Sequence, residues 1–231
     1  LASTGKPVVT VVAVGSALNI PQGDAQILAW YPGQAGGTAL AEIIFGEVNP
    51  SGKLTDTFAK TFADYPSADT FNESDDYVCY FEDIYVGYRY FETIPGAAEK
   101  VNYPFGYGLS YTEFEIAKPV ASVNGQNVRV ETCVKNVGKM AGKEVVQCYF
   151  SAPQGLLGKA NVSLVGFKKT RLLEVGETEN IVIEFPISDM SSYDDLGKLQ
   201  MSAYLLEGGE YTFFVGNSCR NLVAADYRYV V

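Results

Sequence analysis

The sequence predicts an α/β portion followed by an all-β portion, and three observations support this fold class. Near the N-terminus, two nearly continuous apolar runs precede a segment with helical spacing, which is typical of a parallel sheet covered by helices. Beyond residue 117, short alternating runs recur between turns rich in Gly, Asn and Pro, which is typical of an antiparallel β-sandwich. Residues 1–117 hold 5 Lys and Arg against 15 Asp and Glu, whereas residues 118–231 hold 12 of each. We therefore predict two domains, 1–115 and 116–231.

The first portion is predicted to be the distal part of an α/β sandwich. Val8–Val14 and Ala25–Tyr31 are the two apolar runs, and such runs indicate parallel strands buried on both faces. Gln34–Phe45 has a single apolar stripe at helical spacing, with Gly46 placed to end the helix. Two strands and one helix are too few for a stable layer, so we expect this chain, which starts at Leu1, to be a piece of something longer.

The next segment connects the two portions. The order of Pro and Gly in Asn49–Lys53 predicts a turn, and Leu54–Asp76 is polar and irregular, as expected for a surface excursion. Val78–Phe91 alternates in polarity and is predicted to be a strand with successive side chains on opposite faces.

The second portion is predicted to be a sandwich of immunoglobulin or fibronectin type III architecture. Val128, Val130, Thr132 and Val134 alternate with polar neighbours and should share one face. The predicted strands are Val128–Val137, Val145–Ser151, Val162–Thr170, Glu179–Phe185, Leu199–Leu205 and Tyr211–Val215.

Composition excludes several classes of function. The chain has no histidine, which removes Ser-His-Asp and Cys-His catalysis and zinc sites that need histidine. Glycosidase chemistry remains open because it needs only two carboxyl groups. The acidic first half is unsuited to nucleic acid, since phosphate binding needs clustered cations. No apolar run reaches the length of a transmembrane helix, and the sequence assigns no compartment.

The four cysteines, Cys79, Cys133, Cys148 and Cys219, contain no CxxC pair, so a zinc site built from all four is not expected. Cys133 and Cys148 lie in neighbouring predicted strands. A disulfide between them and two buried free thiols are both open interpretations.

Four glycine-rich blocks follow one another in the order WYPGQAGG from Trp30, NPSGKL from Asn49, YFEDIYVGYRYF from Tyr80 and FGYGLSYT from Phe105. In this order they resemble the distal part of family 3 glycoside hydrolases, the β-glucosidase family. Thr55 stands where the family pattern has Pro, and Asp83 where Gly is commoner. The resemblance covers residues 8 to about 218.

The resemblance implies a parent enzyme in which a (β/α)8 barrel carries the nucleophilic Asp. An α/β sandwich carries the acid/base Glu, often on an SGEG-type loop, and many members add a fibronectin-like domain. Neither catalytic motif occurs here. The acid/base residue is expected upstream of Leu1, and the barrel before Leu1 or, in a permuted arrangement, after Val231. Most of the matching blocks are interpreted as structural. Arg89 lies between tyrosines, where its guanidinium could stack on rings or bind a buried carboxylate.

Three adjacent acidic pairs are the candidates for catalysis within the chain: Asp75/Asp76, Glu82/Asp83 and Asp194/Asp195. A retaining glycosidase needs two carboxyl groups about 5–5.5 Å apart. Neighbours on one strand point to opposite faces, which would separate Glu82 from Asp83. The other pairs lie in polar loops, where solvated carboxylates are the rule. We therefore assign no catalytic, cofactor-binding or metal-binding residue, and no cofactor.

The sequence thus predicts part of a β-glucosidase-like hydrolase that removes terminal non-reducing β-D-glucosyl residues. This part would supply sandwich and fibronectin-like domains, pack on the barrel and be inactive alone. The alternative is a free-standing carbohydrate-binding or structural β-sandwich module. The expected partners are an oligosaccharide or β-glucoside substrate, acting through the barrel, with no nucleic acid and no membrane. A homo-oligomer is compatible with either interpretation.

Overall fold

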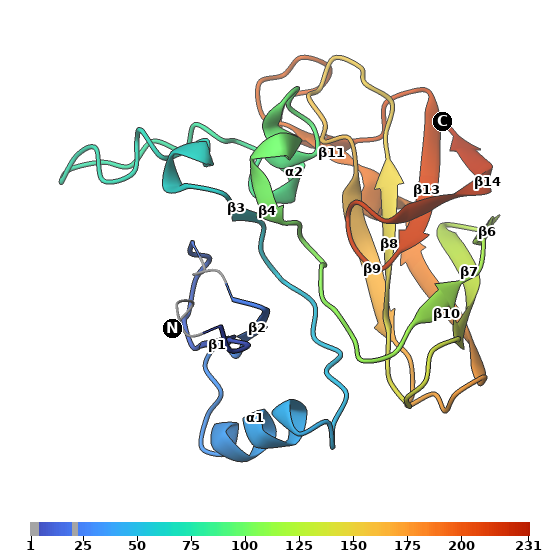
Figure 1. Ribbon diagram of the computed structural model, residues 1–231. Helices are drawn as coiled ribbons and strands as arrows, with labels where there is room; N and C mark the ends of the chain where they lie inside the picture. The colour runs from blue at the N-terminus through green and yellow to red at the C-terminus, as the bar shows by residue number, and fades with distance from the viewer. Residues whose placement is uncertain (1–4, 20–22) are drawn as a thin grey trace.

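The computed structural model describes residues 5–19 and 23–231. It consists mostly of β-strands with few helices, and most of its strand pairs are antiparallel (Figure 1). Two large sheets pack against each other in the C-terminal half. The N-terminal elements form a separate, open layer. Within the described residues, no helix is long and apolar enough to cross a membrane.

The N-terminal layer contains β1 (Val9–Val12), β2 (Ala25–Leu28) and α1 (Gly36–Ile44). The two strands pair in parallel, which confirms the prediction of parallel strands followed by a helix. Gly46 follows the last turn of α1 with φ at +76°, a left-handed conformation that glycine adopts without steric cost.

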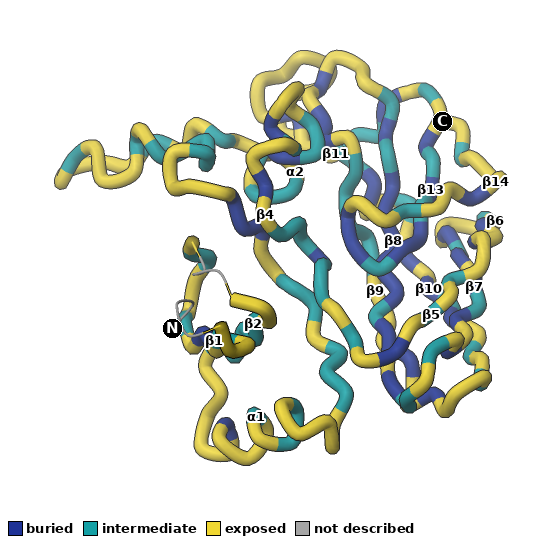
Figure 2. Tube along the Cα trace, viewed as in Figure 1, coloured by how far each residue is buried: buried dark blue, intermediate teal, exposed yellow. Residues whose placement is uncertain are grey.

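The apolar runs predict that this layer is covered on both faces. In the structure it is not. Val9 is 49% exposed and Val11 39%, although strands of this composition normally lie between two helical layers. Figure 2 shows that the chain along β1, β2 and α1 is mostly exposed or intermediate, in contrast to the many buried positions in the strands of the C-terminal half. The N-terminal layer therefore has apolar surface that nothing in the described chain covers.

The connecting segment contains β3 (Phe58–Ala59), which pairs with β4 (Val101–Tyr103), and short helical turns. The turns are the 3-10 helices η2 (Phe62–Asp64) and η3 (Ala97–Lys100) and the four-residue helix α2 (Tyr88–Phe91). Between η2 and α2 the chain forms an arm that projects from the molecule (Figure 1).

The predicted strand Val78–Phe91 is wrong. Residues 81–84 form turns, and α2 occupies the C-terminal end of the segment. Asp83 and Gly87 have φ of +51° and +58°, and extended strands require negative φ. The predicted turn at Asn49–Lys53 is also wrong, because these residues carry no turn.

The first large sheet has the order β10-β7-β5, with β6 also paired to β7. Its strands are β5 (Phe114–Ile116), β6 (Val120–Asn124), β7 (Asn127–Asn136) and β10 (Thr178–Pro186). The predicted alternation in β7 is confirmed, since Val128, Val130, Thr132 and Val134 are all buried. Gly125, with φ at +61°, forms the tight connection between β6 and β7.

The second large sheet has the order β14-β13-β8-β9. Its strands are β8 (Val145–Ser151), β9 (Ser163–Lys169), β13 (Glu210–Gly216) and β14 (Leu222–Val230). The strands predicted at β8, β9, β10 and β13 are confirmed within two residues. The predicted strand Leu199–Leu205 is wrong in extent, because β12 covers only Ala203–Leu205.

Inward-facing side chains of the two sheets form one core. Val128, Val134 and Ile181 from the first sheet meet Val146 and Phe213 from the second, and all five are at most 2% exposed. Beside this core, the 3-10 helix η4 (Ile187–Met190) leads into a short hairpin of β11 (Ser192–Asp194) and β12.

Candidate functional site

Two of the glycine-rich blocks bind each other through backbone hydrogen bonds. The Leu54 N–H donates to the Tyr107 carbonyl, and the Gly106 N–H donates to the Leu54 carbonyl, both at 2.8 Å. The Lys53 ammonium donates to the Gly108 carbonyl at 2.9 Å. The NPSGKL and FGYGLSYT blocks therefore form one joint, which supports a structural role for both.

The glycines of this joint permit close contact. A Cβ on Gly108 would lie 2.3 Å from the Gly52 carbonyl oxygen, and a Cβ on Gly106 would lie 2.2 Å from Gln147 Oε1. Real Cβ atoms do not approach backbone oxygens this closely. Glycine is required at Gly108 because the backbones of the two blocks touch there, and it is favoured at Gly106 because φ there is +78°.

Polar side chains fasten the joint to the β-sheets. Asn49 donates to the Ala141 carbonyl at 3.0 Å and accepts at 2.9 Å from both the Ser110 hydroxyl and the Tyr111 N–H. Lys53 forms an ion pair of 2.8 Å with Glu144, and both side chains are nearly buried. Buried polar groups normally find such partners, so these contacts account for the NPSGKL block without a ligand.

In the GYRYF sequence, Tyr88 packs against other parts of the chain, whereas Arg89 faces solvent. The ring of Tyr88 stacks on Phe105 with centroids 4.7 Å apart, and its hydroxyl accepts a hydrogen bond from the Leu164 N–H at 2.8 Å. Arg89 is exposed. Throughout residues 5–19 and 23–231, no side chain stacks on, hydrogen-bonds to or pairs with its guanidinium, so neither contact proposed for it from the sequence is formed.

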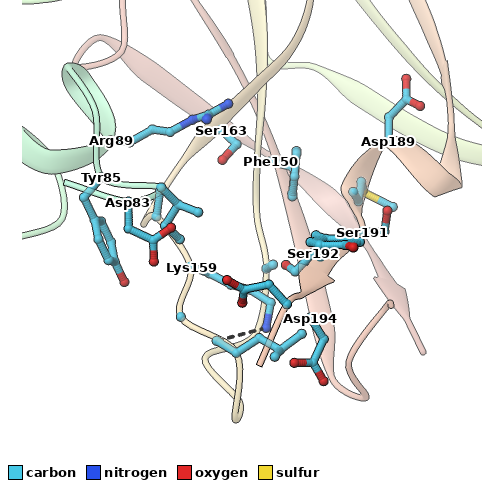
Figure 3. Close-up of a pocket in the computed structure, with 18 of the residues that line it drawn as sticks. Asp83, Tyr85, Arg89, Phe150, Lys159, Ser163, Asp189, Ser191, Ser192 and Asp194 are labelled. Carbon is cyan, nitrogen blue, oxygen red and sulfur yellow. Dashed lines mark hydrogen bonds between the residues drawn. The ribbon is translucent and has the colours of Figure 1, made fainter. Parts of the chain in front are cut away.

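Arg89 lines a surface hollow of about 520 Å³ between the end of the arm and the second sheet (Figure 3). Figure 3 shows Asp83, Tyr85 and Arg89 on one side of the hollow and Ser192 and Asp194 on the other. Asp195 also lines it. The structure thus brings members of two candidate acidic pairs to one place.

The carboxylate of Asp194 is hydrogen-bonded to the backbone of the loop that follows it. This carboxylate accepts hydrogen bonds from the N–H groups of Lys198, Leu199 and Gln200 at 2.7–3.0 Å. Burial acts to raise the pKa of Asp194, but these backbone hydrogen bonds outweigh it and lower the pKa. A general acid of a glycosidase needs the opposite shift, so Asp194 has the environment of a structural carboxylate.

A second carboxylate near the hollow is also committed to structure. Glu207 forms a buried ion pair with Lys159, with side chains 8% and 5% exposed. It also accepts from the Leu156 and Leu157 N–H groups at 2.6 and 3.2 Å. Sequence reasoning missed this pair because 48 residues separate its members and no local pattern joins them.

The third acidic pair lies elsewhere. Asp75 and Asp76 are exposed on the projecting arm, and the Asp76 N–H donates to the Ser74 hydroxyl at 3.1 Å. Outside the seven residues whose structure is not described, no three His, Cys, Asp or Glu side chains are grouped to hold a metal ion. The assignment of no catalytic residue to this chain stays a prediction.

The cysteines are free thiols, which excludes the Cys133–Cys148 disulfide. Strand alternation explains this result, because Cys148 is fully buried in the core whereas Cys133 lies between two core-facing residues of β7. Burial raises the pKa of Cys148 and Cys219 to about 12 in each case, so neither is poised as a thiolate.

Comparison with protein families identifies two regions. Residues 1–111 match the glycosyl hydrolase family 3 C-terminal domain, and residues 144–219 match the fibronectin type III-like domain. The chain is 54% identical over 218 residues to β-glucosidase A of Butyrivibrio fibrisolvens, covering 88% of this chain and 26% of that protein. It is 46% identical over 199 residues to a β-glucosidase of Ruminococcus albus, covering 86% and 21%.

Solved structures show the same relationship. The β-glucosidase 3B of Thermotoga neapolitana in complex with glucose superimposes with a TM-score of 0.86 at 37% identity, over all of this chain and 33% of that one. A β-glucosidase from Paenibacillus barengoltzii gives 0.76 at 46% identity, over 85% and 21%. The chain thus spans between a fifth and a third of the length of these relatives. It belongs to glycoside hydrolase family 3, of which it carries the C-terminal domain and the fibronectin type III-like domain.

Proposed function

We propose that this chain is the non-catalytic portion of a β-glucosidase-type hydrolase. The whole enzyme would remove terminal non-reducing β-D-glucosyl residues with retention, using a nucleophilic and an acid/base carboxyl group. The relatives are named β-glucosidases, which supports hydrolysis of β-glucosides as the reaction of the whole enzyme. The observation that supports the accessory role is the open N-terminal layer, in which the first of two parallel strands exposes Val9 and Val11.

In this proposal the chain has two domains. Residues 1–115 complete an α/β sandwich, and residues 116–231 form a β-sandwich of immunoglobulin or fibronectin type III type. Two four-stranded antiparallel sheets over one core support the second assignment. The strand β5 crosses this boundary and pairs with β7, so the domains are joined by a strand as well as by the glycine-rich joint.

We infer that a (β/α)8 barrel covers much of the exposed apolar surface. Parallel strands and aromatic side chains in water favour association, and isolated soluble proteins rarely expose them together. Besides those of β1, one group of exposed apolar side chains lies on and beside the projecting arm: Phe62, Phe71, Tyr77, Val78, Tyr80 and Phe81. The glycosidic bond that is cleaved would lie at the barrel rather than at this chain.

A chimera tests the proposal. The region of the B. fibrisolvens β-glucosidase A that matches this chain would be replaced by residues 1–231. We expect the chimera to hydrolyse an aryl β-glucoside within about tenfold of that relative, a difference of about 1.4 kcal/mol in barrier. The same relative with the region deleted, and the 231-residue chain alone, serve as controls and should be inactive.

Two outcomes would contradict the proposal. Turnover of the aryl glucoside by the isolated chain would place the catalytic carboxyl groups inside it. A chimera that folds and remains soluble but does not hydrolyse the glucoside would show that this chain cannot fill the accessory role.

A further inference from the structure

We propose that the β11–β12 hairpin and the adjoining hollow form a non-catalytic binding site for a neutral β-glucan chain. The site lies beside the fibronectin-like sheets and uses none of the carboxyl groups that hydrolysis requires. This inference goes beyond the proposed function, because it assigns to the chain a direct contact with carbohydrate.

Two tyrosines supply an aromatic surface. Tyr193 of β11 and Tyr204 of β12 are directly opposite each other in the hairpin, with ring centroids 5.0 Å apart and an angle of 53° between the rings. Tyr193 is 49% exposed and Tyr204 74%. The negative faces of aromatic rings attract the polarised C–H groups of a pyranose ring, and two tilted rings can contact successive sugars of a twisted chain.

The hollow next to this surface supplies polar groups. Tyr193 lines it together with Arg89, Asp83, Asp189, Ser192 and Asp195. In the part of the chain that the structure describes, none of these five polar side chains has a hydrogen-bond or ion-pair partner. They offer both donors and acceptors, as sugar hydroxyl groups require, and the volume of about 520 Å³ falls in the range of small-molecule sites.

The hairpin is held rigidly, which reduces the entropy cost of binding. The carboxylate of Asp194 fixes the loop after β11 through three backbone N–H groups. The carbonyl of Asp194 accepts from the Ser202 N–H at 2.7 Å, and Met190, just before β11, is 1% exposed in the core. The tyrosine side chains therefore stand on a fixed base while their rings remain in solvent.

Charge favours a neutral ligand. Three aspartates that have no partner among the described residues, Asp83, Asp189 and Asp195, surround the hollow together with Asp194. The cations that line it are Arg89 and Lys198. Lys159 also lines it but is neutralised by Glu207. An anionic polymer would meet net repulsion at this site, whereas a hydroxyl-rich neutral chain can use aspartates as acceptors.

Isothermal titration of the 231-residue chain with cellohexaose tests the proposal. We expect saturable binding that weakens about fivefold to tenfold in each of Y193S and Y204S, from the loss of one aromatic contact. Y204F should bind like the unchanged chain, since it keeps the ring. Y80S is the matched control, because Tyr80 is 84% exposed on the arm, and it should leave the affinity unchanged.

Saturation-transfer NMR provides a second readout, which reports how close protein ring protons lie to the bound sugar. Saturation of the tyrosine ring protons should reach the C–H protons of the sugar in the unchanged chain and in Y80S, and should fall in Y193S and Y204S. Cellohexaose should be recovered intact. Cleavage of cellohexaose would contradict the proposed non-catalytic role. The titration would still decide whether the sugar binds at this site.

The proposal is overturned if the folded chain does not bind cellohexaose. It is also overturned if Y193S and Y204S, with unchanged thermal unfolding, both retain full affinity, since the tyrosine pair would then only stabilise the hairpin. If Y80S weakens binding as much as Y204S does, the ligand binds the arm and the assignment of this site is wrong.

Discussion

At the scale of single residues, the buried ion pair between Lys159 and Glu207 is a contact that depends on pH. Burial acts to raise the pKa of Glu207, but hydrogen bonds and charge from Lys159 and the Leu156 and Leu157 N–H groups lower it below 4.5. A carboxyl group whose pKa is lower in the folded state stabilises the fold above its unfolded pKa. That stabilisation is lost as pH falls through the folded value.

We therefore expect the free energy of unfolding to fall as pH drops below about 4.5, and to fall less steeply in E207Q. The measurement is urea unfolding at several pH values between 3 and 7. E210Q is the control, because Glu210 pairs with Arg228 at the surface, where both side chains are more than half exposed, and surface pairs contribute little. Equal slopes for E207Q and the unchanged chain would show that Glu207 does not carry the effect.

At the scale of elements, the joint between the NPSGKL and FGYGLSYT blocks depends on glycine at one side of the contact. We expect G108A to lower the free energy of unfolding by about 1–3 kcal/mol, the usual cost of overpacking, because its Cβ would lie 2.3 Å from the Gly52 carbonyl oxygen. Urea denaturation measures the change.

The facing glycine gives a matched control for this prediction. A Cβ on Gly52 would meet nothing within 4 Å, so G52A should leave the free energy of unfolding within about 0.5 kcal/mol. If G108A and G52A were equally mild, the close approach of the two blocks would not require glycine.

Prediction from sequence succeeded where one face of an element is buried. In β7 every second residue from Val128 enters the core, so the period of two in the sequence reflects packing. In Val78–Phe91 the side chains are exposed or half-buried except Phe91, so the alternation does not mark one buried face. The positive φ at Asp83 and Gly87 then decides the backbone, which alternation alone cannot show.

The candidate site was less predictable for a related reason. Tyr193 and Tyr204 meet across a hairpin whose second strand is only three residues long, too short for a clear alternating pattern. Arg89 and Asp195 reach the same hollow from segments more than one hundred residues apart. Such proximity depends on tertiary structure and leaves no signal in local spacing.

At the scale of the whole molecule, burial is divided unequally between the two halves (Figure 2). Most of the core residues belong to the two large sheets, while a cluster centred on Phe91 and Ala59 is the smaller core of the connecting segment. β1 and β2 contribute one buried side chain, Val12. Stability should therefore be concentrated in the C-terminal half.

Separated halves of the chain should behave differently for this reason. We expect residues 1–115 alone to aggregate or to remain partly unfolded, because Val9, Val11 and the aromatic arm have no cover and unpaired strand edges promote association. Residues 113–231, which keep β5 complete, should stay monomeric and unfold in one reversible transition, because both sheets and their shared core are retained. Light scattering and thermal circular dichroism measure both properties. A sharp, reversible melt of monomeric 1–115 would mean that the N-terminal layer is complete in itself, and its exposed valines would no longer require a barrel to cover them.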